Sequence, residues 1–211
     1  MAYDLEEQEQ LAAIKAWWAQ YGKLVILTVI AGLLVVGGIR GWHYYRNSQA
    51  ASALALFDQM QRADRANDAK KVRDIAAQIV DKYSSTQYAT MASLAAAKSN
   101  FDTGDLPAAK TQLQWVIDNG KEEEARDVAR LRLARVLLDE KKPAEALKLL
   151  ETKHGDSFDG LYADVKGDAL FADGKRAEAR AAYQIALEKS DAASPTRQIV
   201  QLKLDALGES K

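Results

Sequence analysis

Few side chains in this sequence could carry out catalysis or hold a metal ion. The chain contains no cysteine and only two histidines, His43 and His154. Neither histidine has a second histidine or a pair of carboxylates at the spacing of metal ligands, which argues against a metal site. The absence of cysteine also removes disulfides, thiolate ligands and a catalytic thiol.

Two acidic segments resemble functional motifs, but each has a structural explanation. The tripeptide Asp-Thr-Gly at 102–104 occurs in aspartic proteases, yet here it falls in an expected turn between helices, where Asp and Gly are common. Three consecutive glutamates at 122–124 suit the beginning of a helix, because negative charge stabilises that end. The sequence has no phosphate-binding loop, dinucleotide fingerprint or nucleophile elbow. We therefore expect a protein that is not an enzyme and binds no cofactor.

The distribution of charge excludes another class of partner. The formal net charge is −1, so no strong positive field would attract nucleic acid. Acidic residues gather near the N-terminus, at Asp4, Glu6, Glu7 and Glu9, whereas acids and bases balance over the rest of the chain. We expect no nucleic-acid partner, and we interpret residues 1–20 as a short acidic tail.

One segment is apolar enough to cross a membrane. It begins at Leu24 and ends at Ile39 without a charged residue, and its sixteen residues would span roughly 24 Å of a ~30 Å hydrocarbon core. Aromatic residues at both ends could reach the headgroup layers and complete the span. These expected membrane-interface anchors are Trp17, Trp18, Tyr21, Trp42, Tyr44 and Tyr45. We predict an uncleaved transmembrane signal-anchor helix over residues 21–43, in preference to a buried core helix or a cleaved signal peptide.

The sequence does not determine how this helix is oriented. Lys15 and Lys23 precede the apolar segment, and Arg40 and Arg46 follow it closely, so the positive-inside rule gives a tie. Gly37 and Gly41, at the end of the segment, have the GxxxG spacing of some helix-dimerisation faces. A membrane protein that self-associates through this helix, and binds no clients, is therefore an alternative function.

Residues 44–211 are expected to form a soluble, all-α domain. Apolar residues recur at helical spacing and short turns interrupt them. The predicted helices cover residues 46–65, 69–82, 87–102, 105–118, 122–140, 143–152, 159–172, 175–189 and 195–207.

The predicted helices are arranged as a repeat. Turn residues at Asn67, Gly104, Lys141 and Gly174 are 37, 37 and 33 residues apart, and similar small and apolar residues surround each of them. This pattern is typical of a tetratricopeptide-like α-solenoid, in which stacked helix pairs bury together what one pair cannot bury alone. We expect about four helix pairs and a C-terminal capping helix. An irregular helical bundle is the alternative.

Protein binding is the function that this architecture favours. In a tetratricopeptide stack, the first helix of each pair lines a groove that can hold a segment of another protein. The repeat frame predicts that a mostly apolar set of side chains faces this groove: Phe57, Met91, Lys98, Phe101, Leu131, Arg135, Leu138, Leu161 and Phe171. A shift of the frame by one residue would instead place some of them in the core.

The chain as a whole resembles the YfgM family of ancillary SecYEG translocon subunits. The resemblance covers nearly the full length and depends on an ordered series of short motifs after an acidic tail. They are Trp17-Trp18, Gly22-Lys23, Gly41-Trp42-His43-Tyr44-Tyr45-Arg46-Asn47-Ser48, Leu131-Arg132-Leu133-Ala134-Arg135, Lys166-Gly167-Asp168-Ala169-Leu170 and Leu202-Lys203-Leu204-Asp205-Ala206-Leu207.

This resemblance implies a location and a set of partners. It implies a single-pass protein of the bacterial inner membrane, with a cytoplasmic N-terminus and a periplasmic repeat domain. The implied partners are the SecYEG translocon, a PpiD-type periplasmic foldase (a prolyl isomerase homologue), unfolded secretory or outer-membrane clients, and membrane lipid around the one helix. The implied function is a scaffold and chaperone that hands exported proteins to periplasmic chaperones.

Overall fold

The computed structural model describes residues 2–191 and 194–208, and their side chains from residue 7 onward. Within these ranges the chain forms helices and no strand, which confirms the all-α class. The helices are α1 (Ala2–Arg65), α2 (Ala69–Tyr83), α3 (Gln87–Asp102), α4 (Leu106–Asn119), α5 (Glu123–Asp139), α6 (Pro143–Leu150), the short 3₁₀ helix η1 (Asp156–Phe158), α7 (Asp159–Ala172), α8 (Arg176–Lys189) and α9 (Pro195–Ala206).

Helix α1 is longer than the sequence pattern indicates. It runs without a break through the expected tail, the expected span and the first predicted repeat helix. No proline occurs in its 64 residues, so nothing in the backbone chemistry interrupts it. The acidic side chains of Asp4 and Glu6, which we assigned to the tail, lie outside the described side chains, and Met1 lies outside the described residues.

The chain divides into two compact units, Met1–Gln49 and Ala50–Lys211. In the first unit, the apolar side chains of α1 are exposed, among them Leu27, Leu33 and Leu34. By length and composition, this part of α1 could cross a membrane. A helix so apolar and so little covered needs an apolar environment around it.

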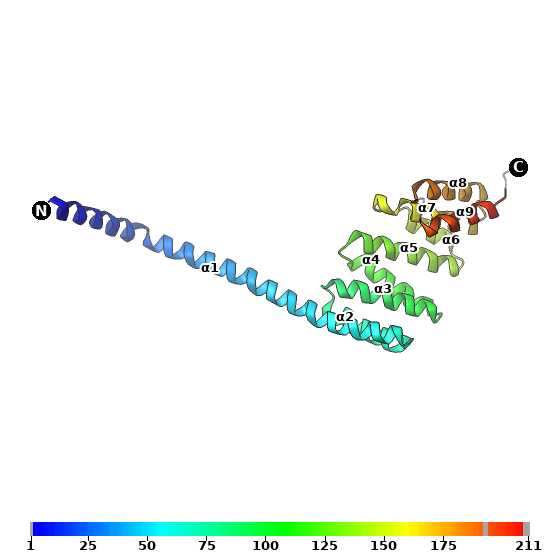
Figure 1. Cartoon of the computed structure of the whole chain (residues 1–211), viewed down its shortest axis with the longest axis horizontal. Coiled ribbons are helices and arrows are strands. Elements are labelled where there is room, and N and C mark those ends of the chain that lie inside the picture. The colour runs from blue at the N-terminus through cyan, green and yellow to red at the C-terminus, as the bar shows by residue number, and fades with distance from the viewer. Residues whose placement is uncertain (1, 192–193, 209–211) are drawn as a thin grey trace. The chain divides into compact units, whose positions relative to one another are not determined.

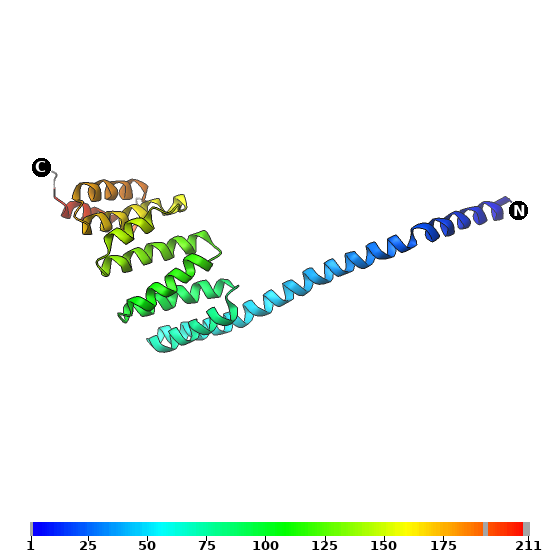
Figure 2. The same ribbon diagram turned by 180° about the vertical axis from the view of Figure 1, so that it is seen from behind.

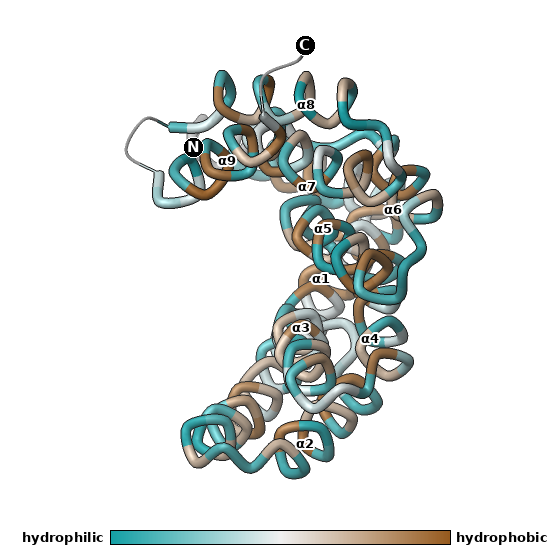
Figure 3. The backbone as a smooth tube through the Cα atoms, turned by 90° about the vertical axis from the view of Figure 1, so that its right-hand side faces the viewer, coloured by the Kyte–Doolittle hydropathy of each residue, from teal (hydrophilic) through white to brown (hydrophobic). Residues whose placement is uncertain are grey.

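The second unit begins with the last turns of α1 and consists of helix pairs. Figures 1 and 2 show, from opposite sides, that α2 to α8 follow one another as successive layers of this unit. Figure 3 shows these helices along an arc, with α3 and α5 nearer its open side than α4 and α6. We call the side formed by α3, α5 and α7, the first helices of their pairs, the inner face.

Four turns of the same geometry join the helices of each pair. The residue at each turn has a positive φ: 53° at Asn67, 79° at Gly104, 61° at Lys141 and 80° at Gly174. After each of them, the next N–H donates to a carbonyl five residues back, at 2.8–2.9 Å, as in a Schellman motif. These are the four turn positions that the repeat frame predicts. Their common geometry favours the repeat over an irregular bundle.

The second helix of each pair contributes equivalent residues to the core. The first of these positions is occupied by Val72, Ala109, Ala146 and Ala179, all of them buried. One turn later lie the buried side chains of Ala76, Leu113, Leu150 and Tyr183. This recurrence confirms the predicted frame, and the buried residues form three contiguous clusters along the unit.

The last helix pair shows why one glycine of the repeat is required. A Cβ atom on Gly167 of α7 would lie 2.4 Å from Cε1 of Tyr183 on α8. The Tyr183 hydroxyl donates to Asp168 at 2.7 Å, so its ring is held in this position. Only glycine at position 167 allows the two helices to approach this closely.

The third pair departs from the sequence expectation. Helix α6 ends at Leu150, two residues before the predicted end at residue 152. A buried carboxylate holds the connection that follows: Asp127 of α5 accepts from the Tyr162 hydroxyl at 2.9 Å and from the backbone N–H of Gly155 at 3.1 Å. Arg130 also donates to Asp127 at 2.8 Å, which compensates its buried charge.

Candidate protein-binding face

The predicted groove residues separate into three groups. Exposed side chains are those of Met91, Lys98, Phe101, Arg135 and Phe171. Leu138 and Leu161 are partly buried against the largest core cluster. Phe57 and Leu131, at 7% and 5% exposure, belong to the core.

The prediction that Phe57 and Leu131 line a groove is therefore wrong. The Phe57 ring packs within 5.7 Å of the Tyr88 ring, measured between centroids, inside the first core cluster. Leu131 joins the cluster between α3 and α7. Phe57 and Leu131 each lie ten residues before a turn residue, Asn67 or Lys141, so this position of the repeat faces the core in both pairs and its assignment to the groove was the error.

Exposed side chains from two helices, α3 and α5, lie around one hollow on the inner face. Lys98 and Phe101 are one turn apart on α3, and Arg132 and Arg135 are one turn apart on α5. We call this cavity, of about 270 Å³, the α3–α5 hollow; the residues that line it are Ala97, Lys98, Phe101, Leu113, Arg132, Arg135 and Val136. Its lining is apolar apart from three cationic side chains. Met91 and Phe171 lie outside it.

Two of the three cations have carboxylate partners. Lys98 donates to Asp102 one turn later, and this bond raises the pKa of Lys98. Arg135 lies 3.8 Å from the Asp164 carboxylate, a long contact, while Lys203 approaches Asp164 to 2.8 Å. The cationic charge of Lys98 and Arg135 is therefore partly neutralised within the chain.

Arg132 differs from the other two cations. Within the described ranges its guanidinium has no carboxylate partner, and its polar contact is a 3.4 Å hydrogen bond to the Leu94 carbonyl. Desolvation by the surrounding side chains, together with the charge of Arg135, lowers its pKa. Arg132 was not among the predicted groove residues, although its spacing from Arg135 puts both on one side of α5.

At α7, the charged side chains of the inner face are paired with a cation from α9. Lys203 of α9 donates to Asp164 at 2.8 Å and to Asp168 at 2.7 Å. Burial raises the pKa of Asp164, and the Lys203 ammonium opposes that shift. This end of the face is occupied by paired charges, so it offers less unpaired charge than the α3–α5 hollow.

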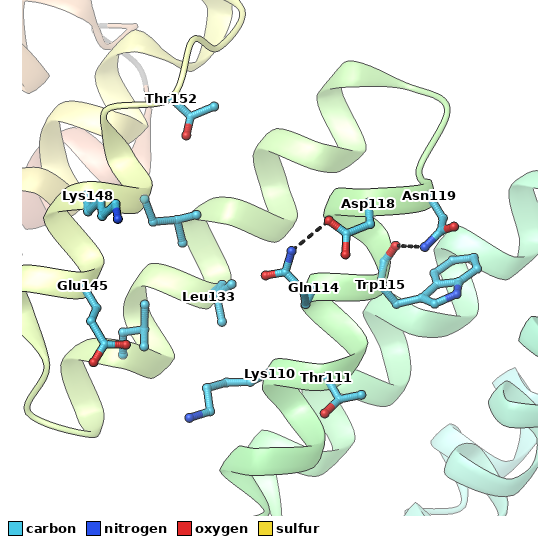
Figure 4. Close-up of a pocket in the computed structure, with 12 residues that line it drawn as sticks. Lys110, Thr111, Gln114, Trp115, Asp118, Asn119, Leu133, Glu145, Lys148 and Thr152 are labelled. Carbon is cyan, nitrogen blue, oxygen red and sulfur yellow. Dashed lines mark hydrogen bonds between the residues drawn. The ribbon is translucent and has the colours of Figure 1, made fainter.

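A larger hollow lies between α4, α5 and α6, and eight of its twelve lining residues are polar or charged. It has a volume of about 920 Å³, and Figure 4 shows Lys110, Gln114, Glu145 and Lys148 around it. Gln114 donates to Asp118 at 2.9 Å, as the dashed line in Figure 4 indicates. Gln114 and Asp118 therefore already pair with each other, while Trp115, Leu133, Leu137 and Leu149 form the apolar part of the lining.

The residues first considered for chemistry have structural environments. The turn at 102–104 contains one of the four positive-φ positions, and Glu123 pairs with Arg126 and Arg130. The His154 ring stacks on Tyr162, with centroids 3.7 Å apart. Among the residues that the structure describes, no group of three or more His, Cys, Asp or Glu side chains could hold a metal ion.

Comparison with known proteins places the chain among similar sequences. Residues 15–209 match the family described as "Tetratricopeptide repeat-like domain". A protein of Escherichia coli (strain K12) is 33% identical over 95% of this chain and 96% of its own length. Relatives in Neisseria gonorrhoeae and Haemophilus influenzae are 33% and 30% identical, each over 98% of this chain and 100% of their own length. All three relatives are named "Ancillary SecYEG translocon subunit".

Proposed function

We propose that this protein is a membrane-anchored, non-enzymatic scaffold that binds proteins beside the translocon. The chain belongs to the tetratricopeptide-repeat-like family of ancillary SecYEG translocon subunits, and this membership supports the proposal. The observation that carries this proposal is the combination of two features in one chain. Its first unit is an exposed apolar helix, and its second is a repeat whose inner face carries exposed aromatic and cationic side chains. The first feature would hold the protein in the bilayer and the second would receive a partner.

The finer part of the proposal concerns orientation and partners. We propose a cytoplasmic N-terminus and a periplasmic repeat unit in the bacterial inner membrane. There the protein works with a PpiD-type foldase and passes unfolded exported proteins to periplasmic chaperones. The resemblance to the family supports this part, whereas the charges that flank the apolar segment are balanced and support neither orientation.

Affinity purification tests the proposed partners. The full-length tagged protein is extracted from membranes in a mild detergent, and co-purifying proteins are identified by mass spectrometry. A tagged single-span membrane protein with an unrelated soluble domain is the control. We expect SecYEG subunits and a periplasmic prolyl isomerase with this chain and not with the control. Recovery of the chain alone, or of cytoplasmic proteins, would contradict the proposal.

Protease accessibility tests the orientation separately. In spheroplasts, an added protease should digest the repeat unit after residue 49 and leave the membrane-embedded part of α1 protected. The same digestion of intact cells is the control, because the outer membrane then excludes the protease. A repeat unit that stays intact in spheroplasts and is cut only after lysis would place it in the cytoplasm.

Self-association through α1 is the second candidate function. Gly37 and Gly41 lie one turn apart on α1, and a Cβ atom at either position would meet nothing within 4 Å, so this side is open to another helix. Replacing both with isoleucine should abolish self-association, measured by crosslinking in membranes, if this function holds. Unchanged crosslinking would remove the candidate.

A further inference from the structure

We propose that the α3–α5 hollow is a docking site for a protein segment in which a large apolar side chain lies next to carboxylates. The inference rests on the proposed function, since it specifies which segments the scaffold would receive on its inner face. It goes beyond that function by assigning a site and the chemistry of its occupant.

The size and lining of the hollow suit one apolar side chain. Its volume of about 270 Å³ lies just below the ~300–1,000 Å³ of ordinary small-molecule pockets. Ala97, Leu113 and Val136 form its apolar part, and all three are buried at its base. The Phe101 ring, 40% exposed, stands at its side and would lose much of its contact with water when the hollow is filled.

The charges around the hollow define the neighbours of that side chain. Lys98, Arg132 and Arg135 all line it, and no acidic side chain does. Asp102 pairs with Lys98, and Asp164 pairs with Lys203 and lies 3.8 Å from Arg135. A carboxylate on the partner could therefore approach Arg132 without competing for an existing ion pair.

Arginine is suited to this recognition. Its planar guanidinium can bind a carboxylate through two parallel hydrogen bonds, and it is more weakly hydrated than an ammonium group. Arg132 is partly desolvated in the free protein and its charge is opposed by Arg135, so a bound carboxylate would relieve an unfavourable arrangement. The position of a partly desolvated cation at the edge of an apolar cavity thus favours an acidic and apolar segment over a purely apolar one.

Three synthetic peptides of equal length test the proposal with full-length protein in detergent micelles. The first carries a phenylalanine between aspartate and glutamate residues. The second replaces each carboxylate with its amide, and the third keeps the carboxylates but replaces phenylalanine with serine. Binding is measured by fluorescence anisotropy of the labelled peptides at low and at high salt. Micelles without protein are the blank.

We expect the first peptide to bind at least about tenfold more tightly than either of the others. Arg132→Glu should weaken its binding by about tenfold or more, because the substitution turns an attraction into a repulsion. Phe101→Ala should weaken it several-fold through lost apolar contact. Lys148→Glu makes the same charge change at an exposed site on α6, and Ile185→Ala removes an exposed apolar side chain of α8; both should leave binding unchanged.

Several outcomes would overturn the proposal. These are equal binding of all three peptides, or Arg132→Glu and Phe101→Ala variants that bind as the unmodified protein does. A preference for anionic detergent or lipid micelles that the first peptide cannot compete with would also overturn it, by indicating a lipid site. Circular dichroism of each variant establishes that the fold is kept. Translocon subunits that still co-purify with Arg132→Glu would leave the proposed function standing even if this site fails.

Discussion

Replacing Lys141 with glycine alters the backbone of one turn while leaving the core unchanged. Lys141 has a φ of 61°, a conformation that costs an L-residue roughly 1–2 kcal/mol. Its side chain is exposed and makes no ion pair within the described residues. At the equivalent positions of two other turns the chain has Gly104 and Gly174, which adopt the same φ region without this cost.

The net effect is smaller than the strain, because glycine also gains freedom in the unfolded chain. The greater freedom of glycine in the unfolded chain lowers stability by about 0.5–1 kcal/mol. Subtracting this from the strain that glycine relieves, we expect Lys141→Gly to raise the free energy of unfolding by about 0.5–1 kcal/mol. At roughly 2–4 °C per kcal/mol for a domain of this size, the expected rise in Tm is about 1–4 °C. Gly174→Ala should do the opposite and lower stability by about 1 kcal/mol. A Cβ at Gly174 meets nothing within 4 Å, so its cost comes from the backbone alone.

Thermal unfolding of the full-length protein, followed by circular dichroism at 222 nm in detergent, measures both effects. The apolar part of α1 keeps its helix in the micelle, so the transition reports the repeat unit. Lys141→Ala is the matched control: it removes the side chain and keeps the positive φ, and it should change the Tm little. A Lys141→Gly variant with a lower Tm than the unmodified protein would refute the explanation of the turn by backbone strain.

Three further predictions concern contacts in the repeat unit. Gly167→Ala should lower the free energy of unfolding by about 2–3 kcal/mol, because the new Cβ would overlap the fixed ring of Tyr183. Urea unfolding measures this loss, and a value below about 0.5 kcal/mol would contradict the close approach of the two helices. By the same assay, Asp127→Ala should lower the free energy of unfolding by about 3 kcal/mol, since it leaves the Tyr162 hydroxyl and Arg130 without their buried partner. The control Asp118→Ala, at an exposed position, should lower it far less. Hydrogen bonds from Arg126 and then Arg130 lower the pKa of Glu123 to about 2 from an ordinary 4.5, so its contribution to stability is complete above pH ~4.5 and is lost as the pH falls toward 2. Glu123→Gln should therefore flatten the acid side of the stability–pH curve, and an unchanged curve would contradict the assigned ion pairs.

The repeat could be predicted from the sequence because its signals are local. A positive φ favours glycine or asparagine, and three of the four turn residues are of these types. The buried positions of the second helices recur at fixed distances from each turn, as Ala109 and Ala146 show, so the period of the repeat is visible in the sequence. Lys141 was placed by spacing alone, since its residue type gives no such signal.

Other features depend on tertiary contacts that no local pattern records. A change in hydropathy separates the apolar segment from the rest of α1, but a helix can continue across such a change, as it does here. Phe57 and Leu131 have the residue types of a binding groove as well as of a core, and only packing distinguishes the two. From the sequence, Arg132 is expected to be an ordinary solvated cation. The hollow that it lines exists only because α3 and α5 lie side by side in the folded protein.

The C-terminal helix partly neutralises the acidic charge at one end of the inner face. Lys203 of α9 lies 2.8 Å from Asp164 and 2.7 Å from Asp168, so one cation contacts both carboxylates of α7. Without α9, Arg135 would be the one cation left in contact with Asp164 among the ion pairs of the described residues, and Asp168 would lose its contact with Lys203. The last helix therefore acts as an electrostatic shield as well as a cap on the core. If an acidic segment docks in the α3–α5 hollow as proposed, this shield would reduce the repulsion that the segment meets from α7.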